Sequence, residues 1–397
     1  MSSLEPVAGY LHPNSAAKTS PSLSRVTSNA STGESPALSR LTSTVSASSA
    51  PSLHRSSSPV PLIPRSSSYS RLSLRYQAQG WRFLEHIGLY LNNWPHPVPP
   101  EPAFVRHYST SDDPPSILEL AFYTPKDFKE QTAKGRRYPV VVNFHGGGFT
   151  LGTARDDARW AAYIVQETPA ICVSVEYRLA PEHPFPTAVE DGVEALLHLA
   201  THASIYGIDP SQIALSGFSA GGNLAFAIPL RLASHISSLP SEQPLPLPKI
   251  TAIVSWYPAL DMRIPRSVRR ATSPRPDKTL PDILTGLFDH SYLPDQSSKT
   301  SPYASPSAAT DEQLSSLPQN IAFYLCEWDM LAKEGKDFVE RLRELGKEVE
   351  CTILKETRHA FDKAPCPFGV DPKVGQHYSD ACRMLRDVFD EGGGNVR

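Results

Sequence analysis

A serine between two glycines is the first feature of this chain that could do chemistry. Residues 217–221 read Gly-Phe-Ser-Ala-Gly, a G-x-S-x-G pattern typical of a sharp strand-to-helix turn that exposes the serine hydroxyl. Upstream, residues 145–149 read His-Gly-Gly-Gly-Phe, whose bare backbone N–H groups can approach an oxyanion. One motif offers a nucleophile and the other a place for negative charge. Together they indicate acyl transfer, most simply the hydrolysis of an ester.

A serine hydroxyl becomes nucleophilic only when a histidine takes its proton and a carboxylate orients that histidine. In this strand-turn-helix arrangement the partners follow the serine in the order acid, then histidine. Asp329 and His359 each come just after a β-branched run, so we expect them in neighbouring loops at one edge of a sheet. The predicted relay is therefore Ser219, His359 and Asp329, with Glu327 as the alternative acid.

The glycine run predicts the oxyanion hole. We expect the N–H groups of Gly146, Gly147 and Ala220 to be the donors, and we assign His145 a scaffolding role in that loop. Phe149 and Trp160 are candidate walls of a substrate pocket, with ordinary core packing as the alternative for each.

Short apolar runs alternate with helical patterns through the body of the chain, which indicates a mostly parallel central sheet with helices on both faces. The expected strands are 138–144, 171–175, 212–216, 250–257, 321–325 and 349–354. The expected helices are 157–167, 187–203, 220–234, 332–346 and 374–391. Such sheets place their sites at the carboxyl ends of the strands, where both glycine motifs fall.

The first 75 residues differ in composition from the rest. Serine makes up 23 of them, proline is frequent and large apolar side chains are few, so we expect residues 1–75 to be a disordered tail. Four similar repeats place a serine three residues after an arginine, a pattern that basophilic kinases prefer. The candidate phosphorylation sites are Ser28, Ser43, Ser58 and Ser68. A plain Ser/Arg-rich linker and a basic organelle-targeting segment are the alternatives.

Two segments are expected to cover the site. Residues 76–100 show helical spacing at Leu84, Ile87 and Leu91, which favours a lid helix or a helix packed on the body. A membrane-surface helix is discounted because only Arg82 is basic between Trp81 and Trp94. The Pro- and Ser-rich stretch 262–318, with one helix-like piece at 282–288, is too long for an idle connection. It lies within an expected catalytic domain at 101–392, followed by a flexible C-terminus at 393–397.

Charge and cysteine content exclude several classes of protein. The net charge of −3 argues against a nucleic-acid binder, and it divides into +5 for residues 1–75 and −8 for the remainder. An odd number of cysteines without a C-x-x-C pattern favours free thiols and a reducing, cytoplasmic location. These are Cys172, Cys326, Cys351, Cys366 and Cys382. We expect no metal, no cofactor, no transmembrane segment and no secretion signal.

The motifs at 145–149 and 217–223, with Tyr-Arg-Leu-Ala-Pro-Glu at 177–182, resemble the hormone-sensitive-lipase family of α/β-hydrolases. Asp-Met-Leu at 329–331 and His-Ala-Phe at 359–361 resemble its acid and base loops. The resemblance covers roughly residues 100–392. It implies an α/β-hydrolase fold, a carboxylesterase with short-to-medium acyl preference, and a cap formed by N-terminal helices and an insert.

The same resemblance implies that residues 177–182 form a structural turn in which Arg178 and Glu182 pair. One departure is Phe218, where the family usually has Asp or Thr, and we expect it to alter the packing behind the nucleophile. The family is also similar to plant gibberellin receptors, which lack the catalytic histidine, whereas His359 is present here. Acyl transfer to another alcohol, lactone hydrolysis and non-catalytic ligand binding remain alternatives to ester hydrolysis.

Overall fold

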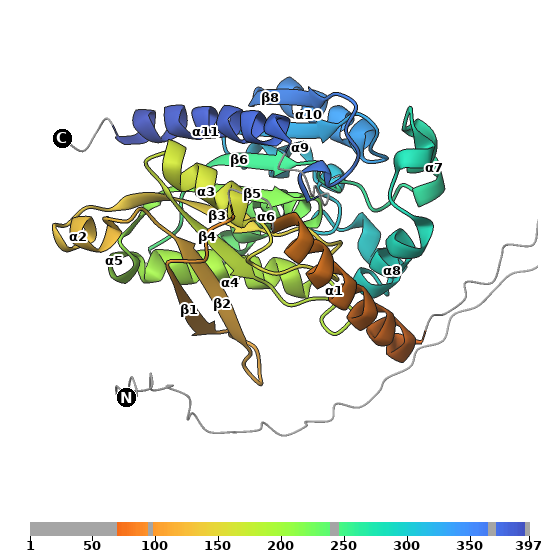
Figure 1. Ribbon diagram of the computed structural model, residues 1–397, viewed down its shortest axis with the longest axis horizontal. Coiled ribbons are helices and arrows are strands. Elements are labelled where there is room, and N and C mark those ends of the chain that lie inside the picture. Colours follow the sequence, from red (N-terminus) through yellow and green to blue (C-terminus); the bar gives the residue numbers. More distant parts are fainter. Residues whose placement is uncertain (1–69, 94–97, 239–245, 364–370, 394–397) are drawn as a thin grey trace, which may run out of the picture. The chain divides into compact units, whose positions relative to one another are not determined.

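The computed structural model describes residues 70–93, 98–238, 246–363 and 371–393. An eight-stranded sheet runs through it in the order β1-β2-β4-β3-β5-β6-β7-β8 (Figure 1). The strands are β1 Phe104–Ser109, β2 Ile117–Tyr123, β3 Tyr138–Phe144, β4 Ile171–Glu176, β5 Ile208–Phe218, β6 Ile250–Trp256, β7 Asn320–Cys326 and β8 Glu348–Leu354. β1 and β2 pair antiparallel with their neighbours, and the remaining six strands are parallel.

Helices cover both faces of this sheet, which confirms the predicted fold class. They are α1 Arg71–Asn93, α2 Phe128–Ala133, α3 Ala158–Glu167, α4 Thr187–Thr201, α5 Ala203–Tyr206, α6 Ala220–Ser238, α7 Arg266–Thr272, α8 Asp282–Tyr292, α9 Asp311–Ser315, α10 Ala332–Glu344 and α11 Pro372–Gly393. All six predicted strands and all five predicted long helices are present, with ends that differ by a few residues. The hairpin of β1 and β2 was not predicted.

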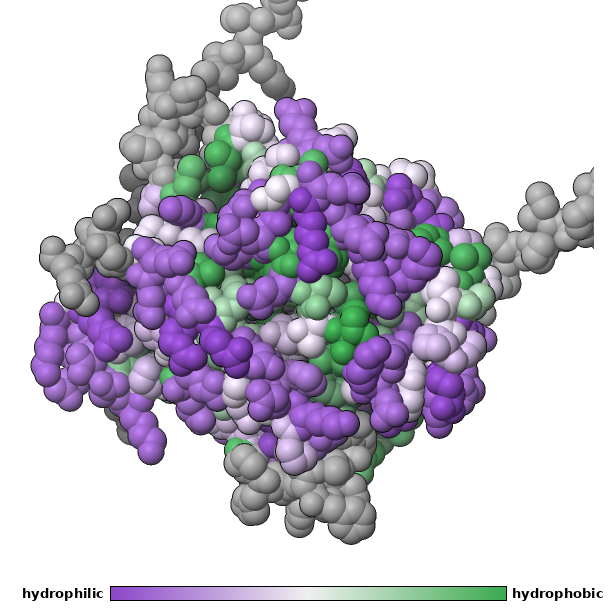
Figure 2. Space-filling view, turned by 90° about the horizontal axis from the view of Figure 1, so that it is seen from above, coloured by the Kyte–Doolittle hydropathy of each residue, from purple (hydrophilic) through white to green (hydrophobic). Residues whose placement is uncertain are grey.

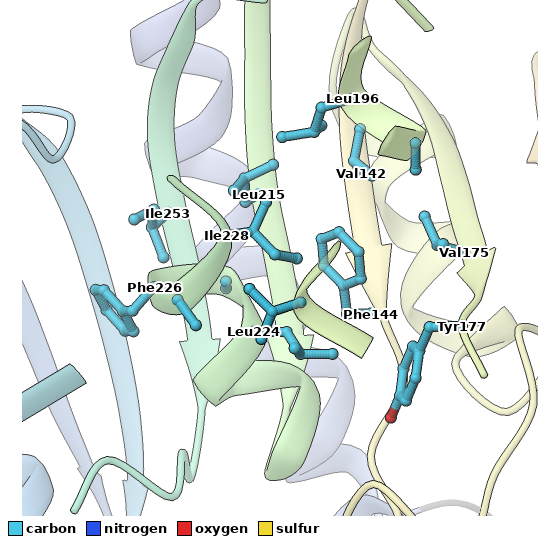
Figure 3. Close-up of a cluster of buried hydrophobic side chains, with 14 of the residues drawn as sticks. Val142, Phe144, Val175, Tyr177, Leu196, Leu215, Leu224, Phe226, Ile228 and Ile253 are labelled. Carbon is cyan, nitrogen blue, oxygen red and sulfur yellow. The ribbon is translucent and has the colours of Figure 1, made fainter. Parts of the chain in front are cut away.

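Alternation along the strands divides the core into two layers. Val140, Val142 and Phe144 of β3 point to the face covered by α4, α6 and α10, whereas Val141 points to the face covered by α3 and α11. Figure 3 shows the first layer, where Leu196 of α4 and Leu224, Phe226 and Ile228 of α6 meet strand side chains. Side chains this tightly buried fix the sheet, and with it the loops at the carboxyl ends of its strands.

The N-terminal boundary lies earlier than expected. Helix α1 begins at Arg71, inside the segment that we predicted to be tail. The four candidate phosphorylation serines and most of the predicted tail lie outside the described residues. The described residues all belong to one compact unit.

The insert at 262–318 contains more regular structure than the sequence predicted. The helix expected at 282–288 is α8 and continues to Tyr292, and α7, α9 and short 3-10 turns surround it. Among the helices of the described residues, none combines the length and the apolar character that crossing a bilayer requires. The face drawn in Figure 2 is mostly hydrophilic, with hydrophobic residues in small separate patches, as on ordinary globular surfaces.

Candidate active site

Ser219 stands at the turn between β5 and α6. Its φ of +54° is left-handed, a conformation that costs a non-glycine residue energy and therefore has to be held by its surroundings. The Ser219 backbone N–H donates to the Trp256 carbonyl at 2.8 Å. A Cβ at Gly217 would collide with the backbone of Gly221, and a Cβ at Gly221 would collide with the backbone of Phe144 in β3. Both positions that flank the serine therefore require glycine. The chain can make this turn only with the small residues that the motif provides.

The predicted histidine and acid meet this serine. The His359 Nε2 atom lies 2.8 Å from the Ser219 Oγ atom, and the His359 Nδ1 atom lies 2.6 Å from an Asp329 carboxylate oxygen. Asp329 and His359 are 1% and 8% exposed, so water competes little for these hydrogen bonds. The second Asp329 oxygen accepts the Leu331 N–H at 3.1 Å, which fixes the carboxylate. With Nδ1–H donating to Asp329, Nε2 is free to accept the serine hydroxyl.

Glu327, the alternative acid, is directed elsewhere. Its carboxylate pairs with Lys355 at 2.8 Å and accepts the Glu356 N–H at 2.9 Å. The structure therefore places Asp329, and not Glu327, against the histidine.

The glycine loop after β3 is held by two rings. The His145 side chain is fully buried and stacks on Tyr177 with centroids 4.1 Å apart. Its Nδ1 lies 2.9 Å from the Gly146 carbonyl, and the Tyr177 hydroxyl donates to the His145 carbonyl at 2.9 Å. Gly147 has a φ of +99°, which a residue with a side chain rarely adopts. This loop and Ser219 line the same cavity.

Gly152 closes the loop and offers a test of it. At its φ of +97°, an added Cβ would collide with the His145 ring and lie 2.9 Å from the Gly146 carbonyl. Gly152→Ala should therefore displace the loop and lower kcat by about 10²–10³-fold, the cost of losing one oxyanion donor. Gly135→Ala is the matched control, because its φ is +95° but nothing lies within 4 Å of the added Cβ. If the purified Gly152→Ala and Gly135→Ala variants had the same kcat, the position of this loop would not matter for turnover.

Two cavities meet at the serine. The larger has a volume of about 260 Å³ and lies against α1 and α8, with Leu89, Leu284 and Phe288 among its apolar walls. The smaller, of about 30 Å³, is lined by Phe149, which stacks on Tyr292 at 3.6 Å. Residues of both segments predicted to cover the site therefore contribute to its walls.

Trp160 lines neither of these two cavities. It is fully buried among core residues on the α3 face, and its indole N–H donates to the Ser216 hydroxyl at 2.9 Å. Of the two aromatic residues proposed as walls, only Phe149 lies on either of these two cavities. The helical spacing of residues 157–167 predicted which side of α3 is buried, but it could not predict how far that side lies from Ser219.

One acidic group on the larger cavity has an unusual environment. Glu85 of α1 accepts the Gly152 N–H at 2.9 Å. Burial, reinforced by the charge of Asp156, raises the pKa of Glu85 to about 7, against the opposing effects of that N–H and of Arg82. The wall formed by α1 thus carries one group that titrates near neutral pH.

A charged cluster lies against the ring of Phe218, the residue that precedes the nucleophile candidate. The Lys363 ammonium lies 2.7 Å from Asp157 and 2.9 Å from Asp362, and it sits over the Phe218 ring at 4.3 Å. Burial raises the pKa of Asp362, but the ammonium and two tyrosine hydroxyls, from Tyr257 and Tyr378, outweigh it and leave that pKa below its usual value. The departure at Phe218 is thus accompanied by an aromatic face for a half-buried lysine.

This cluster ties three loops together. Asp157 precedes α3 and accepts the Asn143 side-chain N–H at 2.8 Å, whereas Asp362 and Lys363 follow the catalytic-histidine candidate by three and four residues. The Tyr257 ring packs edge-on against His359, with centroids 4.9 Å apart. Lys363 could not be predicted as part of this cluster, because its partner Asp157 is distant in the chain.

Lys363→Met should destabilise the protein. It leaves two buried carboxylates without their cation, a change that typically costs about 3–5 kcal/mol. Urea unfolding would measure the loss, with Lys373→Met, an exposed lysine on α11, as the control expected to stay near wild type. The double variant Asp157→Asn/Lys363→Met should recover part of the loss. Wild-type stability of Lys363→Met would show that the ammonium is not what balances these acids.

The pairing implied for residues 177–182 is wrong. The Arg178 guanidinium binds Asp191, whose side chain is fully buried, at 3.0 Å, and it also pairs with Asp112. Glu182 instead pairs with Arg82 of α1 at 2.9 Å. Through the pair of Glu182 and Arg82, this turn is linked to α1. Arg178 pairs with Asp191 instead, because α4 brings Asp191 closer to it than Glu182 is.

None of the cysteines in the described residues lines either cavity at Ser219. Cys172, Cys326 and Cys382 are buried and free, and Cys351 is half-buried and free. Burial raises the pKa values of the Cys172 and Cys326 thiols, which makes them poor nucleophiles. Cys366 lies outside the described residues. Within the described ranges, no group of three His, Cys, Asp or Glu side chains is placed to hold a metal ion.

Comparison with known proteins places this geometry in context. Residues 141–363 match a family profile described as an alpha/beta hydrolase fold. Carboxylesterase NlhH of Mycobacterium tuberculosis is 33% identical over 233 residues, which cover 56% of this chain and 66% of that protein. Hormone-sensitive lipase of Ictidomys tridecemlineatus is 35% identical over 159 residues, 40% of this chain and 19% of that protein. The matches thus span less than two thirds of the length of these curated relatives.

A solved structure agrees with the fold over a longer span. An esterase of Pyrobaculum calidifontis superposes with a TM-score of 0.64 at 26% identity, covering 79% of this chain and 93% of the esterase.

Proposed function

Because this chain belongs to the hormone-sensitive-lipase-like family of α/β-hydrolases, we propose that it is a serine carboxylesterase. One observation carries the proposal: Ser219, His359 and Asp329 form a continuous hydrogen-bonded chain at the mouth of a cavity beside the glycine loop. The names of the similar proteins, a carboxylesterase and an esterase, support the same reaction class.

In the proposed reaction, the Ser219 Oγ atom attacks the ester carbonyl while His359 Nε2 takes its proton. Asp329 holds the ring and stabilises the imidazolium. The N–H groups of Gly146, Gly147 and Ala220 donate hydrogen bonds that stabilise the negative charge on the carbonyl oxygen. His359 then gives its proton to the departing alcohol, which leaves an acyl-serine. Water, deprotonated by the same nitrogen, attacks this ester, and His359 returns that proton to the Ser219 oxygen as the acid leaves.

The cavities support small to medium, rather apolar esters as substrates. We propose that the larger cavity of about 260 Å³ takes the alcohol part, since it also includes Ala360 and Lys363 from the loop that carries the proton donor. The acyl group then enters the smaller one of about 30 Å³, between Phe149 and Leu331. This assignment predicts faster turnover of p-nitrophenyl acetate or butyrate than of long-chain esters.

A fluorophosphonate probe tests the proposal directly, because it reacts with serines that are activated by a neighbouring base. We expect one adduct, on Ser219 by peptide mass spectrometry, together with loss of p-nitrophenyl butyrate hydrolysis in proportion to labelling. A folded protein that gives neither adduct nor turnover would instead be a ligand-binding member of the same fold.

The segment before α1 should be dispensable for the chemistry. Since every side chain of the proposed relay comes from residue 219 or later, deletion of residues 1–69 should leave kcat/KM for p-nitrophenyl acetate within about twofold. Steady-state kinetics on the two purified proteins measures this. A large fall in kcat would mean that the segment contributes to the site.

A further inference from the structure

The loop that follows β3 has an unusual backbone. Four of the six residues at 147–152 have left-handed φ values, which are +99° at Gly147, +59° at Gly148, +60° at Phe149 and +97° at Gly152. Glycine adopts such values readily, but Phe149 pays energy for its conformation. A loop of this kind keeps its shape only when the residues around it hold it there.

Helix α1 holds this loop at two points. The Glu85 carboxylate accepts the Gly152 N–H at 2.9 Å, and the Arg82 Nε–H donates to the Thr150 carbonyl at 2.9 Å. Glu85 and Arg82 are three residues apart, which places them on one face of the helix. One side chain accepts from the loop and the other donates to it, so the pair fixes both ends of the segment 150–152 against α1.

The same arginine links the loop to the turn at 177–182. Its Nη2 atom donates to the Ala180 carbonyl at 2.9 Å and pairs with Glu182 at 2.9 Å. The Ala180 N–H in turn donates to the Phe149 carbonyl at 2.8 Å. The helix, the turn and the glycine loop therefore form one hydrogen-bonded unit.

The acid in this unit is costly, which argues against a role in packing alone. Glu85 is the only acid in α1, and it lines the larger cavity together with Asp156. Burial and the charge of Asp156 raise the pKa of Glu85, so its surroundings disfavour the ionised form. An apolar side chain would fill the same space without that cost. What the carboxylate adds is the hydrogen bond to Gly152.

We propose that Glu85 and Arg82 are positioning residues for the oxyanion hole of the proposed esterase, the function on which this inference rests. They hold the glycine loop in the conformation that lets the Gly146 and Gly147 N–H groups donate to the carbonyl oxygen of the substrate. Both side chains act through the loop and not on the reacting atoms. The helix that covers the cavity is thereby part of the apparatus for turnover.

Glu85→Met tests the proposal by kinetics, since methionine has nearly the length of glutamate but no acceptor oxygen. It should lower kcat for p-nitrophenyl acetate about 10- to 100-fold, as misplaced catalytic groups do, and change KM less than about threefold. Glu85→Gln keeps an acceptor oxygen for the Gly152 N–H and should recover most of the lost kcat. The matched control is His86→Met, the next residue of α1, whose exposed side chain should be replaceable without kinetic effect.

Amide hydrogen exchange measures the loop itself, in the full chain and without substrate. A peptide that covers residues 146–152 should exchange at least about tenfold faster in Glu85→Met than in wild type, because a hydrogen bond to a charged acceptor is lost. Arg82→Met removes the bond to the Thr150 carbonyl and should also speed this exchange, so the test does not depend on one variant. Circular dichroism shows that each variant is folded.

Several outcomes would overturn this inference while leaving the esterase proposal intact. They are wild-type kcat in Glu85→Met, an equal loss of kcat in Glu85→Met and Glu85→Gln, and unchanged exchange in both Glu85→Met and Arg82→Met. A change confined to KM would do the same, because it would make Glu85 a group that binds substrate. A wild-type protein with neither turnover nor a fluorophosphonate adduct would instead overturn both proposals.

Discussion

Ser219→Ala is expected to lower kcat/KM for p-nitrophenyl acetate by at least about 10⁴-fold. Alanine removes the only atom that can form the acyl-enzyme, and what remains is the weak assistance of the oxyanion donors. The side chain that is lost is small and lies at a cavity, so the fold should survive, with Gly217 and Gly221 still shaping the turn. Initial rates, normalised to protein that passes a thermal-unfolding check, give the measurement.

The control for this variant is Ser237→Ala, a serine on the exposed end of α6 whose hydroxyl bonds only to its own helix. It should retain wild-type kinetics. A Ser219→Ala enzyme with more than a tenth of wild-type turnover would mean that another group is the nucleophile.

Asp329→Asn should cost about 10⁴-fold in kcat, with little effect on KM. An amide at 329 can donate to the His359 Nδ1 atom, which favours the tautomer with its proton on Nε2. That nitrogen then faces the serine hydroxyl as a donor and can no longer accept its proton. The magnitude follows the same exchange in the serine-protease relay.

Glu327→Gln is the matched control, two residues away and on the same loop. Its carboxylate binds Lys355 and the Glu356 N–H, so its loss should change kcat less than about threefold. If Glu327→Gln proved the more damaging of the two, the acid would have been assigned to the wrong carboxylate. Kinetics of both variants on one ester separates these cases.

Much of the site could be predicted because the chemistry is tied to strand ends. A buried parallel strand is a continuous apolar run, and its carboxyl end is where the sequence turns polar, as at Cys326 before Asp329. The strand before His359 lies at the edge of the sheet and is only partly buried, but its Val-Glu-Cys-Thr-Ile-Leu sequence at 349–354 was still predicted as a strand. The order of motifs then selected, from local sequence, the three side chains that the structure brings within hydrogen-bonding distance of one another. β1 was not predicted because Arg106 and His107 interrupt its apolar residues, so it shows no apolar or β-branched run.

What could not be predicted depends on contacts between distant segments. Nothing in the local sequence distinguishes Lys363, and only the fold brings Asp157 beside it. Likewise, the fold and not the local sequence decides that Arg178 pairs with Asp191 and not with Glu182. Periodicity predicted that Leu84, Ile87 and Leu91 share one side of a helix. It could not say whether that side faces the protein or the solvent, and the structure turns it outward.

The ion pair between Lys363 and Asp157 also affects folding during synthesis and the stability of truncated chains. Asp157 emerges from a ribosome long before residue 363, so a nascent chain holds this acid in water, or keeps it protonated, until the C-terminal segment arrives. Fragments that stop short of residue 363 would have to bury the acid with no counterion, at a cost of several kcal/mol. The segment that carries Lys363 and the last helix are therefore both needed to close the first half of the chain. A library of C-terminal truncations should lose soluble expression as soon as the cuts enter α11, whose Tyr378, Ala381 and Leu385 are buried in the core.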